Sequence, residues 1–367
     1  MNTADPATTV IWLAFAIGLL FGATASWTRF CTMGAVADIV NLGDWGRMRM
    51  WLLAIALAIL GTTALHATGL IDVDKSIYRG RSLTWLSHLV GGLCFGFGMV
   101  LASGCAARTL VRIGAGSVKA VVVSIVLGLV AYMSMRGVLA VFRVEVLDGV
   151  ALHLPAGQGL PDLIASLGLT PGPTPATCAA LLGGVLLALA LLQRPRLAAT
   201  QVLGGVTVGA LVVAGWYVSG NLGYLAEDPE TLQEAFLATN SGRMESLTFV
   251  APQAYTLDLL LLWSDSSRRV TFAIASALGV VVGSLGHALL SGGFRWEGFR
   301  DLEDTTNHLV GAALMGFGGV VALGCTIGQG ISGVSTLAAG SFLSLFAIIA
   351  GARLALGYQY WRAQGSG

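Results

Sequence analysis

The sequence predicts an all-α protein that crosses a lipid bilayer many times. Apolar residues make up 55% of the 367 residues and charged residues only 11%, whereas a soluble globular protein carries roughly 25% charge. The apolar residues stand in long continuous runs, which argues against the alternating pattern of a membrane β-barrel. Glycine is abundant, with 50 residues, and in membranes glycine lets helices pack closely or break. The class that follows is a polytopic α-helical membrane protein.

Nine apolar runs are long enough to span the membrane, since a crossing takes about 17–25 residues of helix. They cover residues 8–26, 49–69, 87–103, 117–135, 176–193, 199–219, 269–290, 306–323 and 341–357. We therefore expect about nine transmembrane helices.

Three shorter segments between these runs are too short to span and too apolar and glycine-rich for ordinary loops. They cover residues 29–41, 104–114 and 324–339. Backbone of this kind is tolerated at membrane depth only where it is buried in protein or lines a cavity. We therefore expect short re-entrant helices in addition to the nine spans.

An internal repeat is the most informative feature of the chain. HLVGGLCFGFGMVLASGCAAR (88–108) aligns without gaps to HLVGAALMGFGGVVALGCTIG (308–328), and residues 44–66 align to residues 265–287. Four predicted helices form each repeat, with the fifth between them as a linker. Because five crossings separate the starts of the repeats, the second should be inverted, as is typical of transporters. The expected units are residues 1–145, 146–198 and 199–367.

Lys and Arg are distributed unevenly between the two expected membrane faces. The face that holds the loops near residues 27–48, 104–118, 194–198 and 291–305 and the C-terminus carries 12 basic and 6 acidic residues. The other face carries 8 basic and 13 acidic residues. Since basic residues concentrate on the cytoplasmic side, we expect the N-terminus outside and the C-terminus in the cytoplasm. The net charge of +1 indicates no nucleic-acid partner.

Two of the five cysteines occupy matching positions in the repeat. Cys105 and Cys325 each open a glycine-rich break, so inversion should bring them toward each other at the midplane. Cys31 opens the first short segment in RFCTMGA. Its counterpart in the second repeat falls near ESLTFVAP, where Thr248 or Phe249 stands instead. The cysteines form no CxxC or CxxH pair, so neither a metal nor another cofactor is expected.

Thiols at the starts of half-helices suit an anion with a soft sulfur end. A helix N-terminus offers unpaired N–H groups and a positive dipole, and a neutral thiol is a weak donor on polarisable sulfur. A thiolate would repel a dianion, so we expect neutral thiols. Cys94 and Cys178 lie inside apolar helices and are expected only to pack. The candidate substrate site comprises Cys31, Gly104, Cys105, Ala106, Thr248, Gly324, Cys325 and Thr326, with Arg108 attracting anions to it.

At RFCTMGA, GFGMVLASGCAARTLVRIGAGS and GFGGVVALGCTIGQGISG the chain resembles the YeeE/YedE family, which includes bacterial thiosulfate uptake transporters. The resemblance covers nearly the whole chain. It implies an hourglass-like inverted repeat with nine membrane helices and re-entrant helices, in a bacterial cytoplasmic (inner) membrane. It also implies that cysteines hand thiosulfate through a narrow waist. By similarity, Cys105 and Cys325 match the family's Gly-Cys motifs and Cys31 its Phe-Cys motif. A TusA-like sulfurtransferase partner is implied by the family only.

The leading interpretation is a permease for thiosulfate or a related sulfur anion, and not an enzyme. A GxxxxGK[ST] loop is absent from the sequence, so direct drive by ATP is not expected. One alternative is a membrane thiol enzyme that accepts sulfane sulfur as a persulfide. It would need a resolving cysteine near the first, and no two cysteines are neighbours in sequence. The other alternative is a channel for another small solute, which the thiols merely line.

Overall fold

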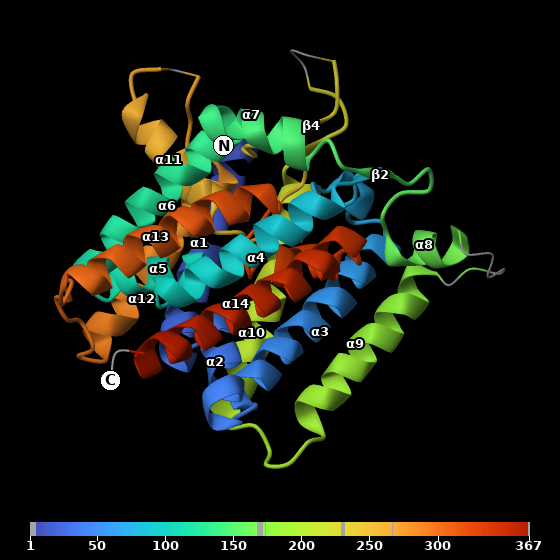
Figure 1. Ribbon diagram of the computed structural model, residues 1–367. Coiled ribbons are helices and arrows are strands. Elements are labelled where there is room, and N and C mark those ends of the chain that lie inside the picture. The colour runs from blue at the N-terminus through green and yellow to red at the C-terminus, as the bar shows by residue number, and fades with distance from the viewer. Residues whose placement is uncertain (1–4, 167–171, 173, 229–231, 266, 366–367) are drawn as a thin grey trace.

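The computed structural model describes residues 5–166, 172, 174–228, 232–265 and 267–365. Within these residues most of the chain is helical, and loops connect the helices (Figure 1). Strands are limited to two antiparallel pairs, β1 (Ser82–Leu83) with β2 (Leu152–His153) and β3 (Tyr224–Leu225) with β4 (Ala235–Phe236). The predicted all-α class is confirmed.

A long helix lies at each of the nine predicted spans. These helices are α1 (Pro6–Thr28), α3 (Gly46–Ala67), α4 (Trp85–Leu101), α6 (Val118–Arg136), α9 (Pro175–Leu191), α10 (Ala199–Tyr217), α12 (Phe272–Leu290), α13 (Leu302–Val321) and α14 (Ala339–Gly365). In the described residues, seven helical stretches are long and apolar enough to cross a membrane. Two of the nine are not among the seven: α9, which has 17 residues and does not continue into a second helix, and α13, which starts with a polar turn that holds Glu303 and Asp304. The protein is thus a multi-pass membrane protein, and the count of nine crossings stays a prediction.

Short helical elements connect the long helices. They are α2 (Thr32–Leu42), η1 (Val73–Lys75), α5 (Ala106–Gly114), α7 (Val138–Phe142), η2 (Arg143–Leu147), α8 (Leu160–Ser166), η3 (Val218–Leu222), α11 (Ala251–Leu261) and η4 (Gly328–Gly333). Three of them, α2, α5 and η4, fall in the segments predicted to be re-entrant. Helices α2 and α11 lie toward opposite ends of the molecule (Figure 1).

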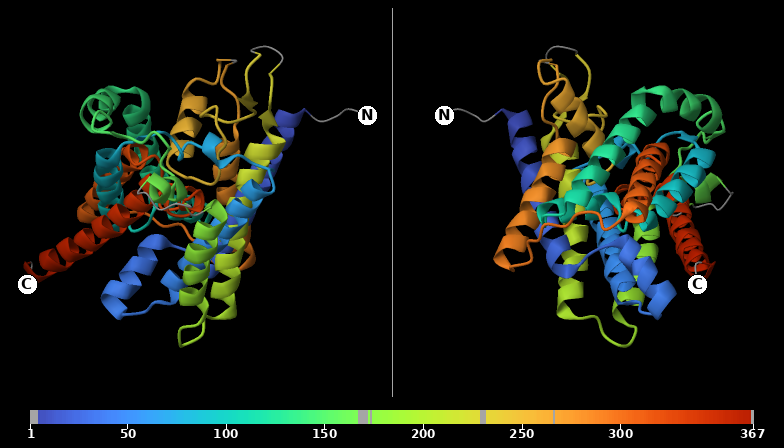
Figure 2. Two further views of the ribbon diagram at one scale, coloured as in Figure 1. Left: turned by 90° about the vertical axis from the view of Figure 1, so that its right-hand side faces the viewer. Right: turned by 60° about the vertical axis from the view of Figure 1, so that its left-hand side comes forward.

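The long helices pair in two related sets. Helix α1 packs on α12, and α3 packs on α10; helix α4 packs on α14, and α6 packs on α13. Helices α4 and α13 also pack on each other, and with α14 they lie side by side across the front of Figure 1. The start of α1 and the end of α14 lie at opposite ends of the molecule (Figure 2).

Glycines allow the central helices α4 and α13 to cross in close contact. A Cβ atom at Gly98 would lie 2.6 Å from the carbonyl oxygen of Gly311, and one at Gly318 would lie 2.5 Å from that of Gly91. Real Cβ atoms do not approach this closely, so only glycine fits. Close backbone approach through small residues is how membrane helices associate without a hydrophobic driving force.

A buried arginine fastens the linker helix α9 to α3. Arg49 is 4% exposed, and its guanidinium donates hydrogen bonds to the carbonyls of Ala190, Pro195 and Gln193 at 3.0, 2.6 and 2.8 Å. A charge at this depth is tolerated because these carbonyls sit at the end of α9, where helical partners are missing. Helix α9 therefore packs outside the two sets of helices.

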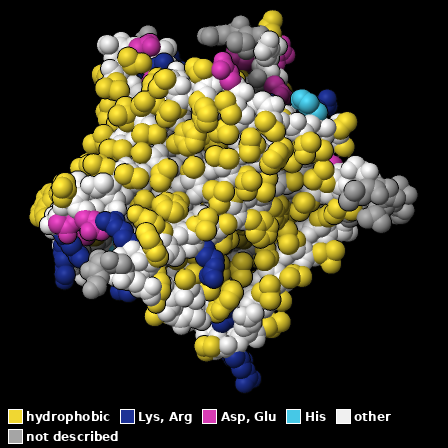
Figure 3. Space-filling model, viewed as in Figure 1, with side chains coloured by type: hydrophobic (Ala, Val, Ile, Leu, Met, Phe, Trp, Pro, Cys, Tyr) yellow, Lys and Arg dark blue, Asp and Glu magenta, His cyan; other side chains and the backbone are white. Residues whose placement is uncertain are grey.

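The outer surface matches a protein embedded in lipid. Hydrophobic side chains cover the middle of the face in Figure 3, and most charged side chains gather toward its upper and lower edges.

Candidate functional site

Each of the three candidate cysteines stands two residues after a residue with left-handed backbone. The pairs are Arg29 before Cys31, Ser103 before Cys105 and Leu323 before Cys325, with φ of 55°, 55° and 58°. This conformation is uncommon outside glycine, and it is a frequent way to end a helix. Here it ends α1, α4 and α13 and reverses the chain. The cysteine therefore opens the short segment that follows each long helix.

The two glycine-cysteine breaks have the same hydrogen bonds. The N–H of Gly104 donates to the Met99 carbonyl at 2.8 Å, and the N–H of Gly324 donates to the Gly319 carbonyl at 2.8 Å. Both bonds belong to the Schellman pattern that satisfies free carbonyls at a helix end. The sequence match between the breaks therefore corresponds to matching backbone geometry. Next in the first break comes Ala106, the fully buried first residue of α5.

Two of the thiols accept hydrogen bonds from backbone N–H groups. Cys31 is the N-cap of α2, and its Sγ accepts from the Gly34 N–H at 3.4 Å. The Sγ of Cys325 accepts from the Gly328 N–H at 3.4 Å. Cys105 is the N-cap of α5, and its thiol makes no such bond. A sulfur that accepts from the backbone keeps its S–H proton free to donate to a ligand.

Cys31 and Cys105 lie side by side, with their thiols within hydrogen-bonding reach of each other. Both thiols are buried, at 8% and 2% exposed. They line a narrow cavity together with Phe21, Ala25, Phe30, Thr32, Ala107, Arg108, Val111 and Ile327. The sequence interpretation expected Cys105 to approach Cys325 and did not foresee that Cys31 lies beside Cys105. The fold brings together two thiols that the chain keeps far apart.

The second repeat closes this cavity. Ile327 lines it, and the hydroxyl of Thr326 lies beside the Cys105 thiol. Cys325 is fully buried, and it directly precedes Thr326, the neighbour of Cys105. The two glycine-cysteine breaks meet, as expected from the repeat.

Thr248 pairs with Cys325 much as Cys31 pairs with Cys105. The Oγ1 atom of Thr248 lies 4.0 Å from the Cys325 Sγ. The N-cap of α11, which corresponds to the position of Cys31 at α2, is Val250. Thr248 therefore supplies the polar neighbour of Cys325, although it precedes the N-cap residue Val250 by two positions.

Tyr78 also reaches the neighbourhood of Cys325, and sequence reasoning missed it. Its hydroxyl would lie 3.4 Å from a Cβ atom at Gly328, and its ring packs edge-on against Trp216 at 6.1 Å between centroids. Burial raises the pKa of Tyr78 above its ordinary value, so the hydroxyl stays protonated and can donate. Tyr78 belongs to a loop outside the repeated segments, so no sequence pattern marked it.

Two buried phenylalanines pack against each other at the site. Phe21 and Phe249 pack with ring centroids 5.0 Å apart, and both are at most 1% exposed. Phe21 lines the cavity with Cys31 and Cys105, and Phe249 follows Thr248 in the chain. The ring contact therefore joins the cavity of Cys31 and Cys105 to the segment that holds Thr248.

The charge at the cavity is positive. Arg108 lines the cavity and has no salt bridge to a carboxylate in the described part of the chain. Nearby, Arg47 pairs with Asp38 at 2.6 Å. An uncompensated guanidinium beside thiols and helix N-termini favours an anionic ligand.

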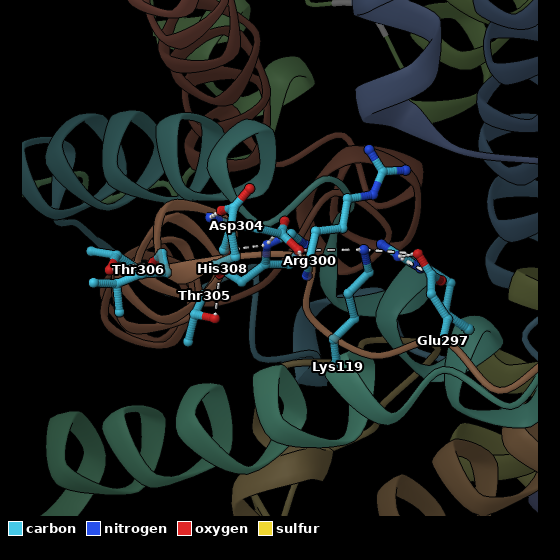
Figure 4. A network of polar contacts seen from close by, with 10 residues as sticks. Lys119, Glu297, Arg300, Asp304, Thr305, Thr306 and His308 are labelled. Carbon is cyan, nitrogen blue, oxygen red and sulfur yellow. Dashed lines mark hydrogen bonds and ion pairs between the residues drawn. The ribbon is translucent and has the colours of Figure 1, made fainter.

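A polar network anchors the far end of α5 (Figure 4). Arg112, in the last turn of α5, and Lys119 both pair with Glu297, at 3.1 and 2.7 Å. Lys119 also approaches Asp304, which contacts His308 at 3.0 Å. Burial alone would raise the pKa of Glu297, but the hydrogen bonds from Lys119 and Arg112 lower it to about 2. The network ties the helix that carries Cys105 and Arg108 to the loop before α13.

The remaining cysteines lie away from the cavity. Cys94 and Cys178 are partly exposed; Cys94 sits where α4 meets Gly318 of α13, and Cys178 packs against the apolar core from α9. The described residues include no group of three or more His, Cys, Asp or Glu side chains that could hold a metal ion.

Comparison with known proteins gives matches over almost the whole chain. A family model described as sulphur transport matches residues 27–354. A protein named thiosulfate transporter TsuA from Escherichia coli (strain K12) is 27% identical over 358 residues, which are 95% of this chain and 94% of that protein. A protein of the same name from Spirochaeta thermophila is 25% identical over 362 residues, which are 93% of this chain and 96% of that protein.

Proposed function

Because the chain belongs to the sulphur transport (YeeE/YedE) family, we propose that it is a permease for thiosulfate or a closely related sulfur anion. The family membership makes it a membrane transporter of a sulfur anion and not an enzyme, as the sequence predicted. Thiosulfate is the substrate in the names of both relatives, and its two ends fit the donors of the candidate site.

The observation that carries the proposal is the chemistry of the cavity between the two repeats. Its polar groups are thiols, a threonine hydroxyl and the Arg108 guanidinium, and no carboxylate lines it in the described residues. Thiols donate weakly from a soft sulfur, while the starts of α2 and α5 offer backbone N–H groups. This combination favours an anion that is partly sulfur over one that is all oxygen.

The proposed path runs from Cys325 to the neighbouring pair Cys105 and Cys31. The anion meets Tyr78, Thr248 and Cys325 on one side, passes the rings of Phe21 and Phe249, and reaches Cys105 and Cys31 on the other. Arg108 attracts it onward. Neutral thiols hand the ion along by S–H contacts, because a thiolate would repel a dianion by several kcal/mol in poorly hydrated surroundings.

We propose further that the two halves, residues 1–145 and 199–367, are inverted repeats joined by residues 146–198. The exchange of helix partners supports this, since α1 on α12 has its counterpart in α10 on α3, and α4 on α14 has its counterpart in α13 on α6. The opposite placement of the two chain ends agrees with an odd number of crossings (Figure 2).

The orientation follows from the basic residues. With Arg108, Arg194 and Arg196 on the inner side, the N-terminus is outside and the C-terminus is in the cytoplasm of a bacterium. The membrane is then the cytoplasmic (inner) membrane. A TusA-like sulfurtransferase would take the anion on that side; this part of the proposal is supported by the family resemblance alone.

The proposal is tested by uptake of labelled sulfur anions into liposomes that contain the purified protein. Thiosulfate should enter in a saturable manner, and sulfate and uncharged solutes should compete poorly. If uncharged solutes competed as well as unlabelled thiosulfate does, the result would instead favour a general channel.

A further inference from the structure

Two of the three candidate cysteines are followed by a threonine, in Cys31–Thr32 and Cys325–Thr326, whereas Cys105 is followed by Ala106. The two threonine side chains are almost fully buried, at 1% and 0% exposed. Neither Oγ1 atom finds a hydrogen-bond partner in the described part of the protein. A buried hydroxyl without a partner is unfavourable, and here each half of the chain holds one directly after a candidate cysteine.

Other threonines near the site do not share this feature. The hydroxyl of Thr109, one turn after Cys105, donates to the Cys105 carbonyl at 3.2 Å, and that of Thr28 donates to the Thr24 carbonyl at 2.8 Å. This local bond is the usual solution for a threonine inside a helix. Thr32 is the first residue of α2, so no preceding turn of α2 presents a carbonyl to it.

The unpartnered hydroxyls are placed at the thiol pair. Thr32 lines the cavity of Cys31 and Cys105, and the Thr326 hydroxyl lies beside the Cys105 thiol without an ordinary hydrogen bond to it. The cavity thus combines two soft donors, the thiols of Cys31 and Cys105, with the harder hydroxyl of Thr32, and the hydroxyl of Thr326 lies next to it beside Cys105. The first repeat supplies both thiols and Thr32, and the second repeat supplies Thr326.

We propose that the hydroxyls of Thr32 and Thr326 bind the oxygen atoms of the transported anion while the thiols of Cys31 and Cys105 contact its sulfur end. The two threonines then determine specificity for an anion that has both kinds of atom. This inference rests on the proposed function, because it assigns the two ends of the anion to particular donors.

The inference has a distinctive consequence, because Val has the shape of Thr without its hydroxyl. Thr32→Val and Thr326→Val remove a buried polar group that has no protein partner, so neither should lower thermal stability, and both should weaken substrate binding. Thr32→Ser and Thr326→Ser keep the hydroxyl and should transport nearly normally. Thr62→Val is the matched control, since Thr62 on α3 is 0% exposed and its hydroxyl also lacks a partner in the described residues, but it does not line the cavity.

The experiment measures initial thiosulfate uptake into liposomes against concentration, together with the melting temperature in detergent, for the wild type and these five variants. Each Val variant at the cavity should raise the half-saturating concentration about tenfold or more, the usual effect of losing a hydrogen bond to a charged group. The melting temperature should be unchanged or higher, and Thr62→Val should transport like the wild type. Wild-type uptake with unaltered half-saturation in both cavity Val variants would overturn this inference alone. Absence of saturable thiosulfate uptake by the wild type would overturn the proposed function, and this inference with it.

Discussion

Ser103 and Leu323 adopt the same left-handed backbone, with φ of 55° and 58°, at matching positions in the two repeats. Each ends a long helix and sets the cysteine that follows two residues later at the start of a short segment. Because neither residue is glycine, both breaks hold some backbone strain, which is common at functional sites. The same backbone geometry therefore sets the start of both cysteine-bearing segments.

The strain at the second break can be measured. Leu323→Gly should stabilise the protein by about 1 kcal/mol, because glycine adopts left-handed backbone freely and the Leu323 side chain is 42% exposed. Leu323→Ala removes almost the same side chain but keeps the strain, so it should not stabilise. The measurement is the free energy of unfolding in detergent. An Ala variant as stable as the Gly variant would show that strain is not the cause.

The contact between α4 and α13 should be sensitive to a single methyl group. Gly98→Ala should destabilise by about 1–3 kcal/mol, the usual effect of overpacking, because its Cβ would lie 2.6 Å from the Gly311 carbonyl oxygen. Gly184→Ala on α9 meets no described atom within 4 Å and should stabilise by up to about 1 kcal/mol through helix propensity. Thermal unfolding of both variants checks this, and a similar effect of the two would contradict the packing described.

Glu297 should make stability depend on pH in acid. Its pKa is lowered from 4.5 to about 2 in the folded protein, so the unfolded chain binds the proton first as the pH falls. The stabilisation is complete above about pH 4.5 and is lost as the pH falls toward 2. Glu297→Gln should therefore flatten the change of melting temperature across this range. An acid dependence identical to that of the wild type would rule out the Lys119–Glu297 pair as its source.

Protonation of the thiols separates transport from covalent sulfur chemistry. We expect uptake to be flat or to fall between about pH 7 and pH 9, around the unperturbed thiol pKa of about 8.5, because a thiolate at Cys105 or Cys325 would repel the anion. Mass spectrometry after exposure to thiosulfate should find unmodified cysteines. A rate that rises with the thiolate fraction, with one sulfur atom added to Cys31 or Cys105, would favour the persulfide chemistry that this neighbouring pair would permit.

The sequence predicted the helices, and it marked Cys105 and Cys325 as candidate site residues, for clear physical reasons. A bilayer requires long apolar runs, so the long helices could be predicted. The repeat has a cysteine at both Cys105 and its counterpart Cys325, whereas Cys94 has no cysteine as its counterpart. The contact between Cys31 and Cys105 was not visible, because it depends on how two short helices pack. The Cys-Thr pairs at residues 31–32 and 325–326 were a signal in the sequence that only burial made informative.

The central claim is that thiols at the two glycine-cysteine breaks conduct a sulfur anion. The most direct test is the initial rate of labelled thiosulfate uptake into liposomes that contain the wild type, Cys105→Ala or Cys325→Ala, with Cys94→Ala and Cys178→Ala as matched controls. These truncations should cost no more than about 1–2 kcal/mol of stability, so all variants should insert. The account predicts saturable uptake by the wild type and both controls, and none above empty liposomes for Cys105→Ala and Cys325→Ala. Wild-type rates in both of these variants would contradict it.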